Sequence, residues 1–157
     1  MKIFITIGTA FSFDRLIKEI DNIKREDWDI IAQTGKSNYK FKNIKKHKSF
    51  FNIENMENII KEADVVVSHA GIGSIVDLIK YKKKCVLVPR LKEFKEVVDD
   101  HQLEICKELE KEGTTICYDV KDIKNKIEEA KELNNLLNNL NFSKKLNSYI
   151  LSINRGN

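Results

Sequence analysis

Short apolar runs rich in β-branched residues alternate along the chain with segments in which apolar residues recur every three or four positions. The first pattern predicts buried strands and the second predicts amphipathic helices. The predicted strands are Lys2–Ile7, Asp29–Gln33, Lys48–Phe51, Asp64–Ser68, Cys85–Pro89 and Thr114–Tyr118. The predicted helices are Phe13–Lys24, Ile53–Glu62, Ser74–Lys82, Asp100–Glu112, Val120–Leu133 and Ser143–Ile153. This alternation is typical of an α/β domain whose mostly parallel sheet is covered by helices on both faces.

The chain has 157 residues, 41% of them hydrophobic, which suffices for one domain with one sizeable core. We expect residues 1–133 to form this single Rossmann-like domain. Residues 134–141 are rich in asparagine and predict a linker to a last helix with an apolar face. That helix either packs on its own domain or docks onto a partner chain.

No window approaches the roughly 18 to 20 apolar residues that a membrane-spanning helix needs. We therefore expect a cytoplasmic protein whose membrane association is peripheral or through a partner. The three cysteines, Cys85, Cys106 and Cys117, have no C-x-x-C spacing and fit buried thiols in a reducing compartment. The net charge of +4 comes from 28 basic and 24 acidic residues, which indicates a mixed surface and no nucleic-acid partner.

The segment from Asp64 to Asp77 carries the most chemical information. A buried strand leads into a turn with Gly71 and Gly73 and then into a helix, so unpaired main-chain N–H groups and the positive end of the helix dipole face any ligand above the strand. Ser74 is placed to cap the helix or bind a phosphate oxygen. Asp77 follows one turn later, where its carboxylate can reach a ribose. His69 either donates to a diphosphate or bonds to nearby main chain.

Other chemistries fit this segment less well. The dinucleotide motif G-x-G-x-x-G requires glycine where Val76 stands, and the P-loop spacing is absent. Ser68 and His69 are adjacent on a strand and point to opposite faces, which disfavours a hydrolase triad with Asp77. Asp27-Trp28-Asp29 matches the D-x-D spelling of metal-dependent sugar transferases, but it precedes its strand and so lies at the edge opposite the ligand loops.

Three separated motifs resemble one family. They are Val67 to Asp77, Val86 to Leu91, and Asp99 to Glu104, together with Thr6-Ile7-Gly8-Thr9 near the start. In this order they resemble the donor-binding subunit of two-component GT-B glycosyltransferases, which carries the glycosyltransferase family 28 C-terminal domain. Lys82-Lys83-Lys84 departs from the Gly-Lys-Pro turn common in the family, which changes the local backbone preferences.

The resemblance implies the GT-B C-terminal half and a set of site residues. The diphosphate would be held by Gly8, Thr9, His69, Gly71, Gly73 and Ser74, the ribose by Asp77, the uracil by the main chain around Ile53, and the donor sugar by His101 and Gln102. A glutamine amide offers both a donor and an acceptor to sugar hydroxyls.

The resemblance also implies an inverting transfer from a UDP-sugar to a lipid-diphosphate-linked saccharide, with no cofactor and no metal. Because the chain is long enough for only one half of a GT-B enzyme, a membrane-anchored acceptor-binding subunit would supply the other half and the general base. Two alternatives stay open from the residues alone, a non-catalytic nucleotide-sugar-binding module and an NAD-type oxidoreductase. The sequence leaves the transferred sugar open, with N-acetylglucosamine or another hexose or uronic acid as candidates.

Overall fold

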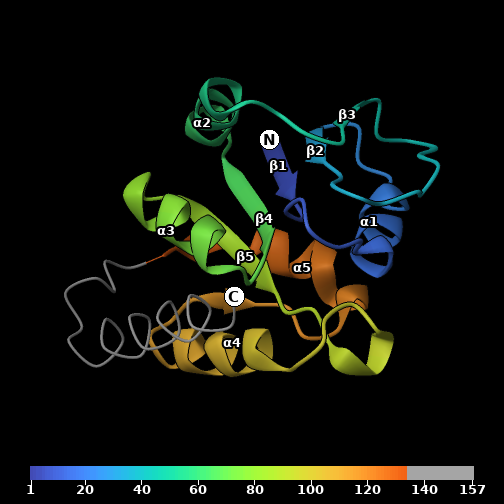
Figure 1. Cartoon of the computed structure of the whole chain (residues 1–157). Coiled ribbons are helices and arrows are strands. Elements are labelled where there is room, and N and C mark those ends of the chain that lie inside the picture. The colour runs from blue at the N-terminus through green and yellow to red at the C-terminus, as the bar shows by residue number, and fades with distance from the viewer. Residues whose placement is uncertain (134–157) are drawn as a thin grey trace.

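A seven-stranded sheet organises the part of the chain that the structure, a computed structural model, describes, residues 1–133. Its strands are β1 (Lys2–Thr6), β2 (Asp29–Gln33), β3 (Lys46–Lys48), β4 (Val65–His69), β5 (Lys84–Val88), β6 (Thr115–Ile116) and β7 (Lys131–Glu132). The order β3-β2-β1-β4-β5-β6 is parallel throughout, and β7 pairs antiparallel with β5 (Figure 1). The predicted mostly parallel α/β sheet is confirmed.

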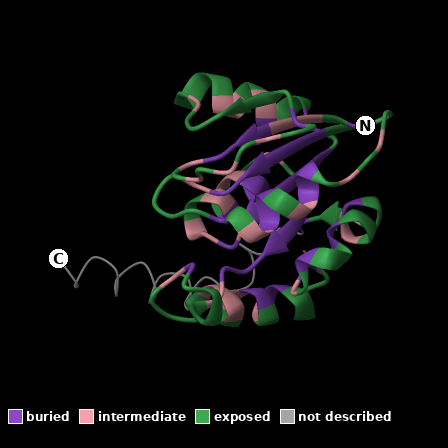
Figure 2. Cartoon of the chain, turned by 90° about the vertical axis from the view of Figure 1, so that its right-hand side faces the viewer, coloured by how far each residue is buried: buried purple, intermediate pink, exposed green. Residues whose placement is uncertain are grey.

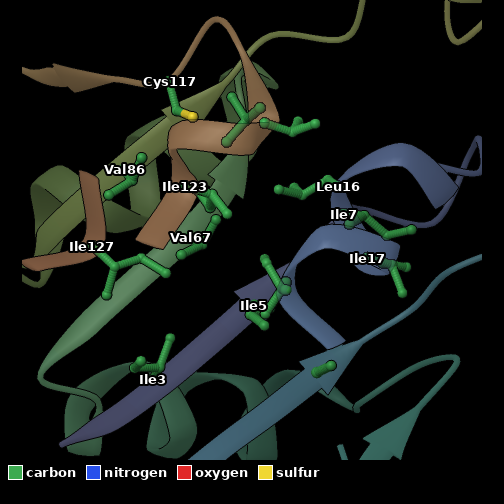
Figure 3. Packing of buried hydrophobic residues seen from close by; sticks show 14 of the residues in the cluster. Ile3, Ile5, Ile7, Leu16, Ile17, Val67, Val86, Cys117, Ile123 and Ile127 are labelled. Atoms are coloured by element: carbon green, nitrogen blue, oxygen red, sulfur yellow. The ribbon is translucent and has the colours of Figure 1, made fainter. Parts of the chain in front are cut away.

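Helices cover both faces of this sheet. They are α1 (Asp14–Asp21), α2 (Ile53–Glu62), α3 (Ile72–Lys80), α4 (His101–Lys111) and α5 (Ile123–Glu128), with short 3-10 turns η1 (Lys92–Phe94) and η2 (Val120–Asp122). Alternate side chains of the central strands point to opposite faces. Ile3 and Ile5 pack against α1 and α5 (Figure 3), whereas Phe4 belongs to the hydrophobic cluster on the other face. The central strands are buried on both faces, as parallel strands require (Figure 2).

The strand order places a topological switch between β1 and β4. From β1 the chain passes through α1 to β2 on one side, whereas α2 carries it from β3 back to β4 on the other side. The loops that leave β1 and β4 therefore diverge, and the crevice between them is where sheets of this order bind ligands.

The predicted helix Val120–Leu133 is wrong after Glu128. The helical part ends at Glu128, and Lys131–Glu132 turns back as strand β7 along β5. Leu133 is buried, and its N–H donates to the Lys83 carbonyl at 3.2 Å. Tertiary pairing thus overrides the weak strand propensity of lysine and glutamate.

The predicted strand at Lys48–Phe51 is displaced to Lys46–Lys48. The following main chain bonds elsewhere, since the Phe51 N–H donates to the side chain of Gln33 at 3.1 Å. The predicted linker and helix in residues 134–157 lie outside the described residues.

Candidate functional site

The β4–α3 connection forms the centre of the candidate site. Gly71 occupies the N-cap position with extended dihedrals, and α3 begins at Ile72. Ile75 makes the first main-chain bond of the helix, to the Gly71 carbonyl at 3.0 Å, so the N–H groups of the three residues before it have no acceptor within the helix. Of the two roles expected for Ser74, capping the helix is excluded, because Ser74 lies in the first turn and no side chain caps α3.

The imidazole of His69 lies between two loops. A Cβ on Gly71 would stand 2.3 Å from His69 Nε2, and a Cβ on Gly8 would stand 2.8 Å from His69 Cε1. Gly8 also has a φ of +70°, which side-chain-bearing residues rarely adopt. The two glycines are therefore needed to let the β1–α1 and β4–α3 loops close around the ring, which brings Gly8, His69 and Gly71 together.

The environment of His69 keeps its ring neutral. Burial, together with the positive charge of Arg90, lowers its pKa to about 4, although the main chain of Thr6 acts in the opposite direction. Nδ1 is buried and has no hydrogen-bond partner of good geometry within residues 1–133. The ring can donate or accept one hydrogen bond at neutral pH but supplies no positive charge.

Ser74 and Asp77 lie three residues apart on α3 and are both half-buried. Burial raises the pKa of Asp77, an effect that Lys80 opposes and Glu57 reinforces. A carboxylate held partly out of water gains from a ligand that donates hydrogen bonds, such as a pair of hydroxyls. Gly73 has no atom within 4 Å of an added Cβ and lines open space, and Thr9 is exposed on the β1–α1 loop.

Helix α2 brings Ile53 to the same edge of the sheet. Asn52 caps this helix by accepting from the Asn55 N–H at 2.8 Å, so the first turn is fixed. Glu57 pairs with Lys80 of α3 at 3.4 Å, which holds the two helices side by side. Ile53 is 79% exposed, so within residues 1–133 its surface is open to contact with a base.

The last two predicted residues start α4. His101 is half exposed and lies 3.7 Å from Asp99 and 3.5 Å from Glu104. The Gln102 side-chain carbonyl accepts a hydrogen bond from the main-chain N–H of Arg90 at 3.1 Å. This bond orients the amide of Gln102 and leaves its NH₂ group as the part available to a ligand.

Arg90 is a further candidate site residue, which the sequence analysis did not single out. Its guanidinium donates to the carbonyls of Ile7 and Phe11 and is 2% exposed, and its Nε has no partner within the described residues. Burial lowers its pKa to about 10, partly offset by Glu96, so it stays charged at neutral pH. The sequence signal that could have identified Arg90 is its position after the apolar run of β5. A charged residue that is buried at such a position requires a specific partner.

Arg15 forms a second link between the same loops. Its guanidinium makes two hydrogen bonds to Glu96, at 3.0 and 3.1 Å, and one to the Pro89 carbonyl at 3.3 Å. Glu96 also accepts from the Leu91 N–H at 3.0 Å. The β5–α4 loop is thus fastened to α1 in the same way that Arg90 fastens the β1–α1 loop to β5.

The rejected chemistries are placed away from this site. Asp27 and Asp29 flank the amino end of β1, where they bond to Met1, so the predicted opposite-edge position is confirmed. Ser68 is fully buried and donates to the His69 carbonyl, which gives it no route to a substrate. Residues 1–133 contain no group of three or more His, Cys, Asp or Glu placed to hold a metal, and none of their helices is long and apolar enough to cross a membrane.

The sheet has the Rossmann strand order, and the unpaired N–H groups at the start of α3 lie at its switch point. In proteins of this class, nucleotides bind at that position. Residues 2–153 match the glycosyltransferase family 28 C-terminal domain, and the chain belongs to this family.

Three curated relatives are similar to the chain over part of their length. The UDP-N-acetylglucosamine–N-acetylmuramyl-(pentapeptide) pyrophosphoryl-undecaprenol N-acetylglucosamine transferase of Aquifex aeolicus is 33% identical over 66% of this chain and 30% of its own. The UDP-N-acetylglucosamine transferase subunit ALG13 of Candida albicans is 33% identical over 44% of this chain and 22% of its own. The human subunit of that name is 30% identical over 71% of this chain and 10% of its own. The chain thus spans less than a third of each of these relatives.

Proposed function

We propose that this chain is the donor-binding part of a UDP-sugar glycosyltransferase that transfers its sugar, N-acetylglucosamine by the names of its relatives, to a lipid-linked saccharide. One observation carries the proposal. The β1–α1 and β4–α3 loops pack on the ring of His69, next to the unpaired N–H groups at the start of α3. Oriented amides with a helix dipole stabilise a departing diphosphate without needing a metal or another cofactor.

In this assignment each segment has one role. Gly8, Thr9, Gly71, Gly73, Ser74 and the neutral ring of His69 surround the diphosphate, Asp77 accepts from the ribose, and the start of α2 at Ile53 borders the uracil. His101 and the amide NH₂ of Gln102 face the donor sugar. Arg90 adds a fixed positive charge behind the diphosphate and holds the β1–α1 loop in place.

The acceptor half belongs to a partner. By the resemblance to two-component enzymes, we propose a membrane-anchored subunit that binds the lipid-linked acceptor and carries the general base. Such a partner would hold the chain at the cytosolic face of a membrane.

Calorimetric titration tests the first step. We expect UDP and UDP-N-acetylglucosamine to bind the whole chain in the absence of added metal, and NAD to show no heat of binding. Binding of NAD in preference to UDP would contradict the proposal.

A transfer assay tests the second step. The chain is mixed with membranes of its source organism and radiolabelled UDP-N-acetylglucosamine, and labelled lipid is extracted. Label that enters lipid only when the chain is present supports catalysis, whereas UDP-sugar binding without transfer from any donor supports a non-catalytic sensor.

A further inference from the structure

A basic surface lies along edge strand β3 and the β2–β3 connection of the sheet. Between Asp29 and Glu54 the chain carries six lysines and no acidic residue, namely Lys36, Lys40, Lys42, Lys45, Lys46 and Lys48. These six charges exceed the net charge of +4 of the whole chain, so the remainder is net negative. All six side chains are exposed. The surface follows the β2–β3 connection and β3, at the upper right of Figure 1.

Within residues 1–133 most of these lysines have no acidic partner. Lys46 pairs with Asp29 at 2.8 Å, and Lys48 lies over the ring of Phe51, but no ion pair engages the other four. Lysines on an edge strand also prevent edge-to-edge pairing, yet that role concerns only the two lysines of β3. The four lysines on the connection need a different explanation.

The connection that presents them has a fixed shape. The carboxylate of Asp21, which is fully buried, accepts from the N–H groups of Lys42, Asn43 and Ile44 at 2.8 to 3.0 Å and from the Tyr39 hydroxyl at 3.1 Å. The ring of Phe41 stacks on His47 of β3 with 4.2 Å between centroids. The lysines are therefore held as one surface at little further entropic cost on binding.

Apolar groups border the charges. Phe50 follows β3 and is 61% exposed. Lys46 and Lys48 also line a cavity of about 370 Å³ between α2 and the sheet, with Phe4, Ile31 and Ile59 among its apolar lining residues. A partner that joins an anionic group to an apolar part fits this combination, whereas a nucleic-acid backbone uses only the charges.

We infer that the lysines of the β2–β3 connection, with Phe50 and the adjoining cavity, form a docking surface for anionic phospholipid. The surface runs from Lys36 at the ligand edge of the sheet, where the Gly35 N–H donates to the Ser49 carbonyl at 3.0 Å, to Lys46 at the opposite edge. Lipid bound along this side leaves the nucleotide crevice open beside the membrane. That consequence rests on the proposed function, but the binding itself does not.

Vesicle co-sedimentation of the whole chain tests the inference. We expect binding to vesicles of phosphatidylcholine mixed with phosphatidylglycerol, no binding to phosphatidylcholine alone, and release at about 1 M salt, where the Debye length is about 3 Å. Each lysine near an anionic surface contributes roughly a fivefold factor. K40Q/K42Q/K45Q should therefore lower the partition coefficient by about a hundredfold.

The matched control removes three exposed lysines from α4 and α5, as K107Q/K111Q/K124Q, and should bind nearly as well as the parent. Phe50→Ser should weaken binding without a change of charge. Equal losses in both triple variants, an unaffected Phe50→Ser, or absence of vesicle binding would overturn the inference. So would stronger retention by a single-stranded oligonucleotide, or a dimer that K40Q/K42Q/K45Q abolishes. UDP titration of the same samples tests the proposed function separately, so a failure of lipid binding is distinguished from a failure of nucleotide binding.

Discussion

The Arg90 guanidinium donates a hydrogen bond of 2.8 Å to the main-chain carbonyl of Phe11, and so ties the loop after β1 to the end of β5. Arg15 of α1 makes a second connection between these segments by donating a hydrogen bond to the Pro89 carbonyl. Two loops that border the same crevice are thereby fixed relative to each other, which is the rigidity that an anion site made of main-chain N–H groups needs.

Arg90→Met should lower both stability and affinity for UDP. The change leaves the buried Ile7 carbonyl without its donor, which costs about 1–3 kcal/mol, and it also removes the hydrogen bond to the Phe11 carbonyl. It also removes the charge behind the diphosphate. Urea unfolding and UDP calorimetry measure the two effects. Arg25→Met is the control, because that arginine pairs with Asp27 and Glu128 at the surface and should change neither quantity much.

Gly71→Ala should strongly lower the stability of the fold, and Gly73→Ala should not. An added Cβ meets His69 Nε2 at 2.3 Å in the first variant and no atom within 4 Å in the second, although both positions lie at the start of α3. We expect a loss of about 1–3 kcal/mol of stability for Gly71→Ala. His69→Ala in the same chain should recover part of it, since the clash is then absent. Equal effects of the two glycine variants would contradict the proposed role of the ring.

These examples show what the sequence could and could not predict. The strands β1, β2, β4 and β5 are long apolar runs, so periodicity located them and, with them, the ligand edge. The strand β7 escaped prediction because Lys131 and Glu132 pair through tertiary contacts alone. Gly8 and Gly71 were predicted at the site, but their packing on opposite sides of one imidazole is a contact between loops distant in sequence. Arg90 was missed for the same reason.

Asp77→Asn should weaken UDP binding without lowering stability. Removing the acceptor for the ribose should cost about 1–3 kcal/mol of binding free energy. Burial raises the pKa of Asp77, so its ionised form destabilises the fold as pH rises through that pKa, and a neutral amide relieves this cost. Titrations with UDP and 2′,3′-dideoxy-UDP check the assignment. If the variant and the parent discriminate equally between the two ligands, Asp77 does not contact the ribose.

Gln102→Ala should lower the affinity for the UDP-sugar without lowering the affinity for UDP. The side-chain carbonyl of Gln102 accepts a hydrogen bond from the main-chain N–H of Arg90, so the NH₂ group is the part available to the sugar. The variant should bind UDP as the parent does and bind UDP-N-acetylglucosamine about tenfold more weakly, the usual loss of one hydrogen bond. Parallel losses for both ligands in calorimetry would show that Gln102 acts on the loop and not on the sugar.

Asp21→Asn should destabilise the chain at neutral pH and much less in acid. Burial raises the pKa of Asp21, but the hydrogen bonds from Ile44, Lys42, Asn43 and Tyr39 outweigh it, so the folded-state pKa lies below the usual value. The carboxylate therefore contributes its full stabilisation above about pH 4 and loses it as pH falls through the lowered pKa. Urea midpoints of parent and variant should differ most at pH 7 and converge below pH 4. Asp27→Asn, an exposed carboxylate, should show little difference at either pH, and a gap for Asp21→Asn that widens in acid would disprove the assignment.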